Sequence, residues 1–500
     1  MKKTIIFSTI AAAMTLSANA AAKPEANDSL VRNYMRSSLY TIILNSDKMN
    51  AYYEEESQKT DASATMALIK GFSKADSKKA ANDTVDTDIS LFELPARVFT
   101  DIEIPNQFND HNLGTRILDF DAIKATVTDE DVSAAAEKFG QTAKKKGGFG
   151  KFAKGMMGMS TKGNDNNQEF DKVVPGVMYK FFEQDHVAPN LIAKWYDYNP
   201  DGEKHWGLGT IMDRGNYNFS KEELAKAKDD INIQNKIAWT SQQMIGNTYV
   251  LAVNLRFRSH QAIVAEAAAL AKAAGSKLGS LGALAADVAS AGASAATGDG
   301  YTVQAVTYLY RLKWSDDLNQ KFGVDFYGKQ STTLEDLINS GLCELEFVGS
   351  EKSSSNIRQR LLSGKPIRSL IKRATARAID EAIIKLQNSH EEFRTVLPIL
   401  GGDGTNIYAA IGTKEGLNEK DEYEILEAQE KENGEITYKA VGTVKAVKGK
   451  IMDNAYGAAE DLEDASVSEE EKAAINRSYS EFKGKKGDYT GYYLRLKKKN

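Results

Sequence analysis

The sequence predicts an α+β protein: a mixed α/β sheet region carrying a helical hairpin insertion, followed by a small C-terminal β-barrel of SH3-like form. Three observations support this class. Residues 247–257 and 301–314 are rich in Val, Thr, Tyr and Leu, which favour strands. Residues 366–387 repeat apolar side chains at helical spacing. Beyond residue 393, short strand-like segments alternate with turn residues.

The chain begins with a segment typical of a secretory signal. Lys2 and Lys3 precede a short apolar run, and Ala18-Asn19-Ala20 supplies the small residues of a cleavage site. The run is too short for a comfortable membrane span. We therefore expect residues 1–20 to be removed and the mature chain to have no transmembrane span. It would work in the periplasm, at the outer membrane or on the cell surface of a bacterium.

The composition excludes two classes of protein. Cys343 is the single cysteine among 500 residues, so no intramolecular disulfide is expected, and a buried core thiol is favoured over a reactive one. The formal net charge is −5, and removal of Lys2 and Lys3 makes it more negative by two. A general nucleic-acid binder would instead carry a dominant basic field. The length suggests roughly two to four domains.

The N-terminal α+β region is expected to span 27–143. It contains predicted strands at 38–44 and 91–99 and a predicted helix at 129–143, where Thr128 is the N-cap and Asp131 follows three residues on. Residues 144–169 form a basic loop rich in glycine and methionine. Two interpretations of this loop remain open: a solvated loop, or a segment that touches a membrane or a partner.

The α/β domain is expected to span 170–392, with an Ala-rich helical insertion at 262–297. The expected helices are 175–184, 220–245, 334–339 and 366–387, and the expected strands are 191–198, 205–212, 247–257, 301–314 and the segment around Cys343. Ser353-Ser354-Ser355 is predicted to lie in a surface loop. The insertion is interrupted by charges, which favours a hairpin packed on its own sheet over a membrane hairpin.

The SH3-like barrel is expected at 393–450, followed at 451–500 by an acidic helix, a last strand and a basic tail. Predicted strands lie at 394–400, 406–411, 422–426, 436–447 and 489–496, and the acidic helix at 460–472. Asn433-Gly434 between two of these strands is a strong hairpin signal. Four to five short strands with close turns fit a small barrel.

Two short motifs resemble a phosphate-binding loop and a calcium-binding loop, but the residues that follow each motif do not fit that function. Residues 401–405 (GGDGT) match a kinase phosphate loop, but a strand-like segment follows where that loop needs a helix, so a β-turn is favoured. Residues 197–202 match the first half of a calcium loop, but Leu208 stands where the bidentate acid should be. The five histidines are scattered and no HExxH occurs, so no metal or cofactor is expected.

Two sets of polar residues are candidate binding sites. Asn109, Asp110 and His111 lie in the densest polar segment, and Arg214 lies in a similar turn-like segment. They either hold a small ligand or an anion, or form hydrogen-bonded loop ends. The second set is a basic run with no compensating acid. It either docks to an envelope protein or an anionic membrane surface, or forms a face exposed to solvent. It comprises Arg358, Arg360, Arg368, Lys372, Arg373 and Arg377.

The C-terminal region resembles a known family. An alanine-rich helix at 373–382 precedes residues 411–425 (IGTKEGLNEKDEYEI), which are similar to the GxxxGLxxGDxFxV stretch of envelope proteins of the curli-secretion and flagellar-assembly T type. The resemblance implies an α/β domain with a small barrel and an envelope context. Lys420 replaces the glycine of the motif, and no lipid-anchor cysteine is present.

The leading hypothesis is therefore an exported, non-enzymatic envelope protein that acts as an assembly, adaptor or structural interaction component. Two alternatives stay open. A secreted hydrolase, for example one acting on glycans, can use two carboxylates dispersed in the sequence. A small-ligand carrier would use the segment around His111 or Arg214.

Overall fold

A computed structural model describes residues 36–60, 90–145, 165–215, 242–263, 301–329, 331–357, 367–402, 404–431, 436–459, 462, 467–489 and 491–498. The predicted signal peptide, residues 146–164 of the basic loop and residues 264–297 of the Ala-rich insertion lie outside these ranges. So do residues 220–241 of one predicted helix. The described part has both helices and sheets, which confirms the α+β class.

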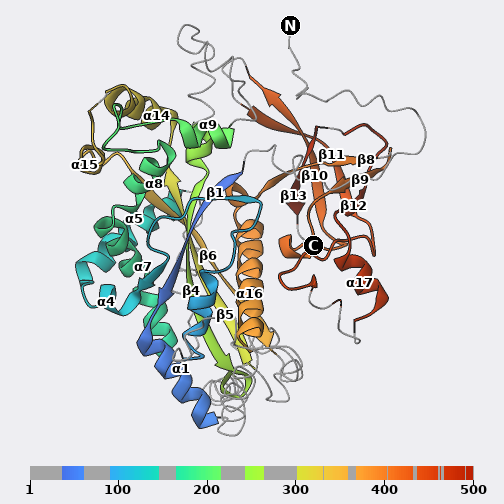
Figure 1. Cartoon of the computed structure of the whole chain (residues 1–500), viewed down its shortest axis with the longest axis horizontal. Coiled ribbons are helices and arrows are strands. Elements are labelled where there is room, and N and C mark those ends of the chain that lie inside the picture. Colours follow the sequence, from blue (N-terminus) through green and yellow to red (C-terminus); the bar gives the residue numbers. More distant parts are fainter. Residues whose placement is uncertain are drawn as a thin grey trace.

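The first module is built on a six-stranded mixed sheet of order β2-β1-β4-β5-β6, with β3 also paired to β1 (Figure 1). The strands are β1 (Ser37–Asn45), β2 (Phe108–Asp110), β3 (Ile117–Asp119), β4 (Thr248–Ser259), β5 (Tyr301–Lys313) and β6 (Glu344–Ile357). β1 runs parallel to β2, β3 and β4, whereas β4, β5 and β6 are antiparallel. The predicted N-terminal region and the predicted α/β domain therefore share one sheet.

Helices cover both faces of this sheet and make three layers. One face packs against α4 (Phe120–Lys124), α5 (Asp129–Lys145), α7 (Asp165–Gln184), α8 (Val187–Trp195), α14 (Asp316–Phe322) and α15 (Leu334–Asn339). The other packs against α1 (Asp47–Thr60), α3 (Leu94–Phe99) and α16 (Ile367–Ser389). Every residue of β4 is buried, because a central strand has helices on both sides.

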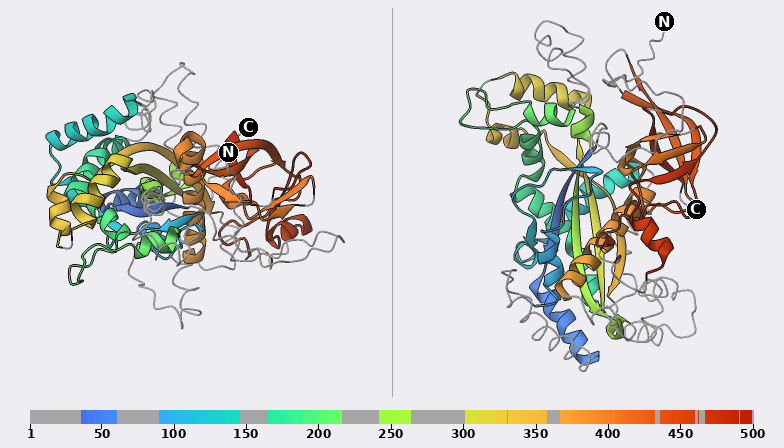
Figure 2. Two further views of the ribbon diagram at one scale, coloured as in Figure 1. Left: turned by 90° about the horizontal axis from the view of Figure 1, so that it is seen from above. Right: turned by 45° about the vertical axis from the view of Figure 1, so that its right-hand side comes forward.

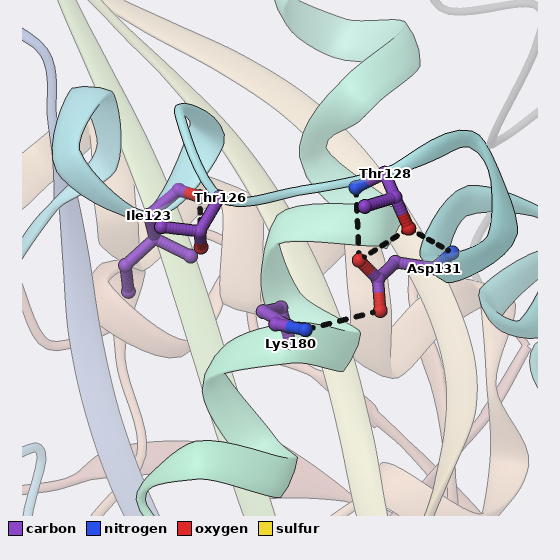
Figure 3. Close-up of polar contacts among 5 residues, drawn as sticks. All are labelled: Ile123, Thr126, Thr128, Asp131 and Lys180. Atoms are coloured by element: carbon purple, nitrogen blue, oxygen red, sulfur yellow. Dashed lines mark hydrogen bonds and ion pairs between the residues drawn. The ribbon is translucent and has the colours of Figure 1, made fainter.

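The predicted start of α5 is confirmed in detail. The Thr128 hydroxyl accepts a hydrogen bond from the Asp131 backbone N–H at 3.2 Å, and the Asp131 carboxylate accepts one from the Thr128 N–H at 2.8 Å (Figure 3). This reciprocal capping satisfies two N–H groups that a helix start leaves without partners. The other oxygen of Asp131 lies 3.4 Å from Lys180 Nζ, which links α5 to α7.

Four local predictions are wrong. Residues 91–99 contain α3, whose Pro95 suits a first helical turn, and residues 191–198 lie largely in α8. Most of 205–212 is loop and the start of α9 (Gly209–Gly215). Short apolar runs do not separate buried helices from strands. The predicted serine loop is part of β6, where the buried Ser353 hydroxyl donates to the Ala378 carbonyl of α16.

The second module is a seven-stranded antiparallel sheet of order β7-β13-β10-β11-β12-β9-β8. Its strands are β7 (Val396–Pro398), β8 (Gly401–Gly402), β9 (Asn406–Ala409), β10 (Glu422–Glu430), β11 (Ile436–Ala446), β12 (Ser480–Lys483) and β13 (Tyr493–Lys498). The predicted C-terminal strands are thus confirmed, and the GGDGT segment leads into a strand. The predicted SH3-like barrel is not confirmed, because no closed barrel is formed by the described strands.

The two ends of the second sheet come from one continuous segment. β7 and β8 are separated by Ile399 and Leu400, whose backbone N–H groups donate to Tyr492 O at 2.9 Å and to Tyr408 O at 2.8 Å. The segment therefore pairs with β13 and then with β9. Around the sheet lie the short 3-10 helix η6 (Thr413–Glu415) and α17 (Glu469–Ile475), which overlaps the last four residues of the predicted acidic helix and extends beyond it.

The helix α16 lies between the two modules (Figure 2). Its apolar stripe, including Leu370, Ile371, Ala378 and Ile383, packs on the first sheet as the sequence predicts. Its other side faces the second module, where Arg377 Nε donates to the Tyr456 carbonyl at 3.1 Å. Gly416 also lies against α16: a Cβ at this position would approach Ile384 Cγ2 to 2.7 Å.

Candidate functional site

Three of the four predicted ligand residues meet at the end of the sheet where β1 begins. Arg214, from the last turn of α9, donates to His111 Nδ1 at 2.7 Å and to Ser38 Oγ at 3.1 Å through NH1. Through NH2 it donates to the Asp110 carbonyl at 2.7 Å. Asn109 does not join them, because its side chain donates to the Arg36 carbonyl at 3.3 Å. The sequence separation of His111 and Arg214 is 103 residues.

The contacts of His111 fix its protonation state. Its side chain is fully buried, and Nε2 lies 3.0 Å from the Leu191 carbonyl, which can only accept a hydrogen bond. Nε2 therefore carries the proton, and Nδ1 accepts from Arg214. Burial, with the nearby Arg214 charge, lowers the pKa of His111 to about 3. The imidazole is neutral at physiological pH and has no free nitrogen, so it is not a general base.

Trp195 connects this cluster to the centre of the sheet. The Arg214 guanidinium lies 4.6 Å from the centre of the indole ring, which is an attractive cation–π distance. The indole N–H donates to the Thr248 hydroxyl at the start of β4, at 2.8 Å. We name Ser38, Asp110, His111, Trp195 and Arg214 the arginine clamp. It joins α8, α9, β1, β2 and β4, and it has the bonding of a structural cluster.

The clamp also has an electrostatic property that could serve a ligand. In the described part of the chain, the hydrogen-bond acceptors of Arg214 are all uncharged, and Lys194 nearby donates to the Asn112 carbonyl. Burial lowers the pKa of both cations, while Asp110 raises it in each case. A small anion would be attracted to these two cations. Anion binding at this place stays a prediction.

A second polar cluster, which the sequence interpretation missed, lies within the first module. Arg256 on β4 is 3% exposed and makes a very short ion pair with Asp171 of α7. The Tyr308 hydroxyl of β5 donates to the same carboxylate oxygen of Asp171 at 3.2 Å. Burial lowers the pKa of Arg256, but Asp171, Tyr53 and Tyr308 together outweigh it and the pKa is raised. The Arg256 guanidinium is therefore charged in the interior.

A neighbouring ion pair extends this cluster. Arg258, two residues along β4, donates to both carboxylate oxygens of Glu56 on α1, at 2.7 and 3.0 Å. The sequence signal was arginine at alternate positions in an otherwise apolar strand (Asn254-Leu255-Arg256-Phe257-Arg258). The two ion pairs link α7 and α1 to β4, and loss of one partner of either pair would leave a buried charge without a counter-charge.

The residues of the predicted basic run fall into three groups. Arg358 and Arg360 lie outside the described residues. Arg377 donates to Tyr456, and the side chain of Arg373 lies against Gly457, where a Cβ would come within 3.1 Å of Cδ. These two arginines therefore contact the second module. Arg368 and Lys372 are half-buried on α16, and their role in docking a partner stays a prediction.

Two acidic side chains lie at the contact between the modules. Asp380 of α16 has a pKa raised to about 7 by burial and by the charge of Glu415, against the opposing effects of Lys414 and Arg377. Burial also raises the pKa of Glu415. The Glu415 carboxylate accepts hydrogen bonds from the Gly412 N–H at 2.8 Å and from Asn454 Nδ2 at 2.9 Å. Glu415 is thus held in place, whereas Asp380 can exchange a proton near neutral pH.

Cys343 precedes β6 and packs against the core of the first module. Burial raises the pKa of its thiol to about 12. The described residues contain no group of three or more His, Cys, Asp or Glu side chains placed to hold a metal. Among the described helices, none has the length and apolar content needed to cross a membrane. Comparison of the chain with protein-family models and with curated protein sequences gives no match.

Proposed function

We propose that this chain is an exported, non-enzymatic component of the bacterial envelope that acts as an assembly, adaptor or structural interaction protein. The observation that carries the proposal is the use of α16 as a common support. One side of this helix packs on the first sheet, and the other holds the second module through Arg377 and Ile384. Such an arrangement presents an accessory β module at a fixed position to a partner.

The bonding of the polar clusters supports this proposal. Both nitrogens of His111 are engaged, and each buried arginine of β4 has a carboxylate partner. These side chains stabilise the fold. The sequence resemblance to curli-secretion and flagellar-assembly T proteins adds an envelope context, and an SH3-like form of the second module belongs to the same proposal.

The proposal is tested in membranes of the bacterium that makes the protein. The tagged mature chain should fractionate with the envelope, and reversing two charges on α16 (Arg368→Glu with Lys372→Glu) should reduce the bound fraction. Lys124→Glu is the matched control, because Lys124 is exposed on α4, far from α16 in the sequence. Unchanged association of the double variant would remove α16 from the mechanism.

A hydrolase is the second candidate, and Asp380 is the observation that favours it. A carboxyl group with a pKa of about 7 is protonated often enough at neutral pH to act as a general acid. The test is turnover on glycan and peptide substrates by the wild type and by Asp380→Asn. Turnover that the substitution abolishes would favour the hydrolase, and the absence of turnover on all substrates would favour the adaptor.

A further inference from the structure

The hairpin of β10 and β11 extends beyond its neighbours in the second module (Figures 1 and 2). β10 and β11 pair over nine residue positions, from Glu422↔Lys445 to Glu430↔Ile436. On its other side β11 pairs with β12 at Lys445 and Ala446 alone. The strand from Ile436 to Val444 therefore has a free ladder on that side, as far as the described strands show.

This free ladder lies on an inner strand of the sheet. The outermost strands, β7 and β8, are joined through Ile399 and Leu400, which use their N–H groups on Tyr492 and Tyr408. A stretch of unpaired N–H and C=O groups is a template for an added strand. β11 contains no proline that would remove an N–H from this edge, and its Lys439 and the bulge at Val441, between Ala440 and Gly442, are the features that limit pairing with other chains.

Four side chains along this ladder are exposed to solvent. Lys439, Ala440, Val441 and Thr443 are exposed, and Val441 exposes 43% of its surface, which makes it one of two exposed large hydrophobic residues in the described part of the chain. β-branched residues and small apolar residues pack well against a cross-strand neighbour. The surface thus offers both backbone hydrogen bonds and apolar contact to an extended chain.

The charges of the hairpin differ between its two strands. Residues 436–450 contain four lysines (Lys439, Lys445, Lys448 and Lys450) and no acid, whereas Glu422–Glu430 contains four glutamates and no base. Within the described residues Lys439 and Lys445 make no ion pair, while β13 supplies Arg495 and Lys497 to Glu424 and Glu422. Lys439 lies within the free stretch and Lys445 directly follows it, so a strand added to β11 would meet lysine side chains, whereas one added to β10 would meet glutamates.

We propose that the β11 edge from Ile436 to Val444 is a docking site for an extended, acidic polypeptide segment of another protein, which binds by adding a strand to the sheet. Main-chain hydrogen bonds supply the affinity in this mode, and alternate side chains and charge supply the selectivity. The inference names the partner chemistry of the proposed adaptor and rests on that function for its biological meaning. Its test does not need the envelope.

The experiment uses the mature full chain and a pair of capped peptides, one alternating Val with Glu and one alternating Val with Lys. Binding is followed by fluorescence anisotropy, and the site by backbone hydrogen exchange. We expect saturable binding of the Glu peptide and slower exchange within 436–444. Lys439→Glu, which reverses the charge of the lysine within the free stretch, should weaken binding by about threefold, since one reversed surface charge contributes modestly. Lys124→Glu should leave the affinity unchanged.

Circular dichroism establishes that each variant is folded before binding is measured. Failure of the Glu peptide to bind, equal binding of the Lys peptide, or protection outside β11 would each overturn the inference. Protection of β11 that rises with protein concentration in the absence of peptide would overturn it too, because the edge would then pair with a second copy of the chain. If the Glu peptide binds at β11 but the mature chain does not associate with the envelope, the proposed function is wrong, whereas the docking site is supported.

Discussion

Removal of the Asp171 carboxylate should be one of the most damaging conservative changes in the first module. Asp171 and Arg256 are 6% and 3% exposed, so Asp171→Asn leaves a buried guanidinium without a counter-charge. Stranding one partner of a buried ion pair costs about 3–5 kcal/mol. The Tyr308 hydroxyl also exchanges a charged acceptor for a neutral one, which adds roughly 1 kcal/mol. We expect a loss of about 4–6 kcal/mol in the free energy of unfolding.

The chain offers a selective probe for this measurement. Trp195, Trp206 and Trp314 lie in the core of the first module, and no tryptophan follows residue 314, so urea unfolding followed by tryptophan fluorescence reports on this module. Replacing both partners (Asp171→Leu with Arg256→Met) should restore most of the loss, because it leaves no unpaired charge. The control is Arg97→Ala, which breaks a surface pair with Glu93 and should cost under about 1 kcal/mol. A loss below about 1 kcal/mol for Asp171→Asn would refute the reasoning.

Three further predictions concern single titratable groups. The pKa of Asp380 is raised to about 7 from the ordinary carboxyl value of 3.8, so the folded state binds more protons between these values, and stability should fall as the pH rises from about 4 to 7. Asp380→Asn should flatten this pH dependence of the urea midpoint, and an unchanged slope would contradict the assignment. The His111 imidazole, with a pKa of about 3, should show no change in its NMR shifts between pH 5 and 8. A midpoint near 6.5 would mean that it is solvated. The Cys343 thiol, with a pKa of about 12, should resist alkylation at pH 8 until the protein is unfolded, and rapid labelling of the native chain would show that it is exposed.

The sequence predicted the sheets better than the helices that cover them. β4 and β5 are long and rich in strand-forming residues, and the Asn433-Gly434 signal lies between β10 and β11. α16 has a clear apolar stripe, and its boundaries were predicted closely. By contrast, α8 is apolar on most sides because it is buried, so its short run gives no helical period. The capping residues of α5 were identifiable because that signal is local.

For the candidate sites too, local sequence signals did not predict contacts between segments that are distant in the sequence. His111 and Arg214 were each selected from local polarity, but their contact joins segments that only the folded sheet brings together. Arg256 and Asp171 were missed because their pairing depends on how α7 docks on β4. Arg373 and Arg377 were interpreted as a free basic surface, since nothing in α16 alone indicates that a second module covers part of it.

The central claim is that the mature chain acts by holding a partner in the envelope. Its most direct test is mild crosslinking of the tagged mature protein in the bacterium that produces it, followed by identification of what co-purifies and of the crosslinked residues. We predict a stoichiometric partner, with crosslinks on the second module or α16. A monomer that crosslinks to no protein, although the chain is abundant and folded, would contradict the claim and direct attention to Asp380 and substrate turnover.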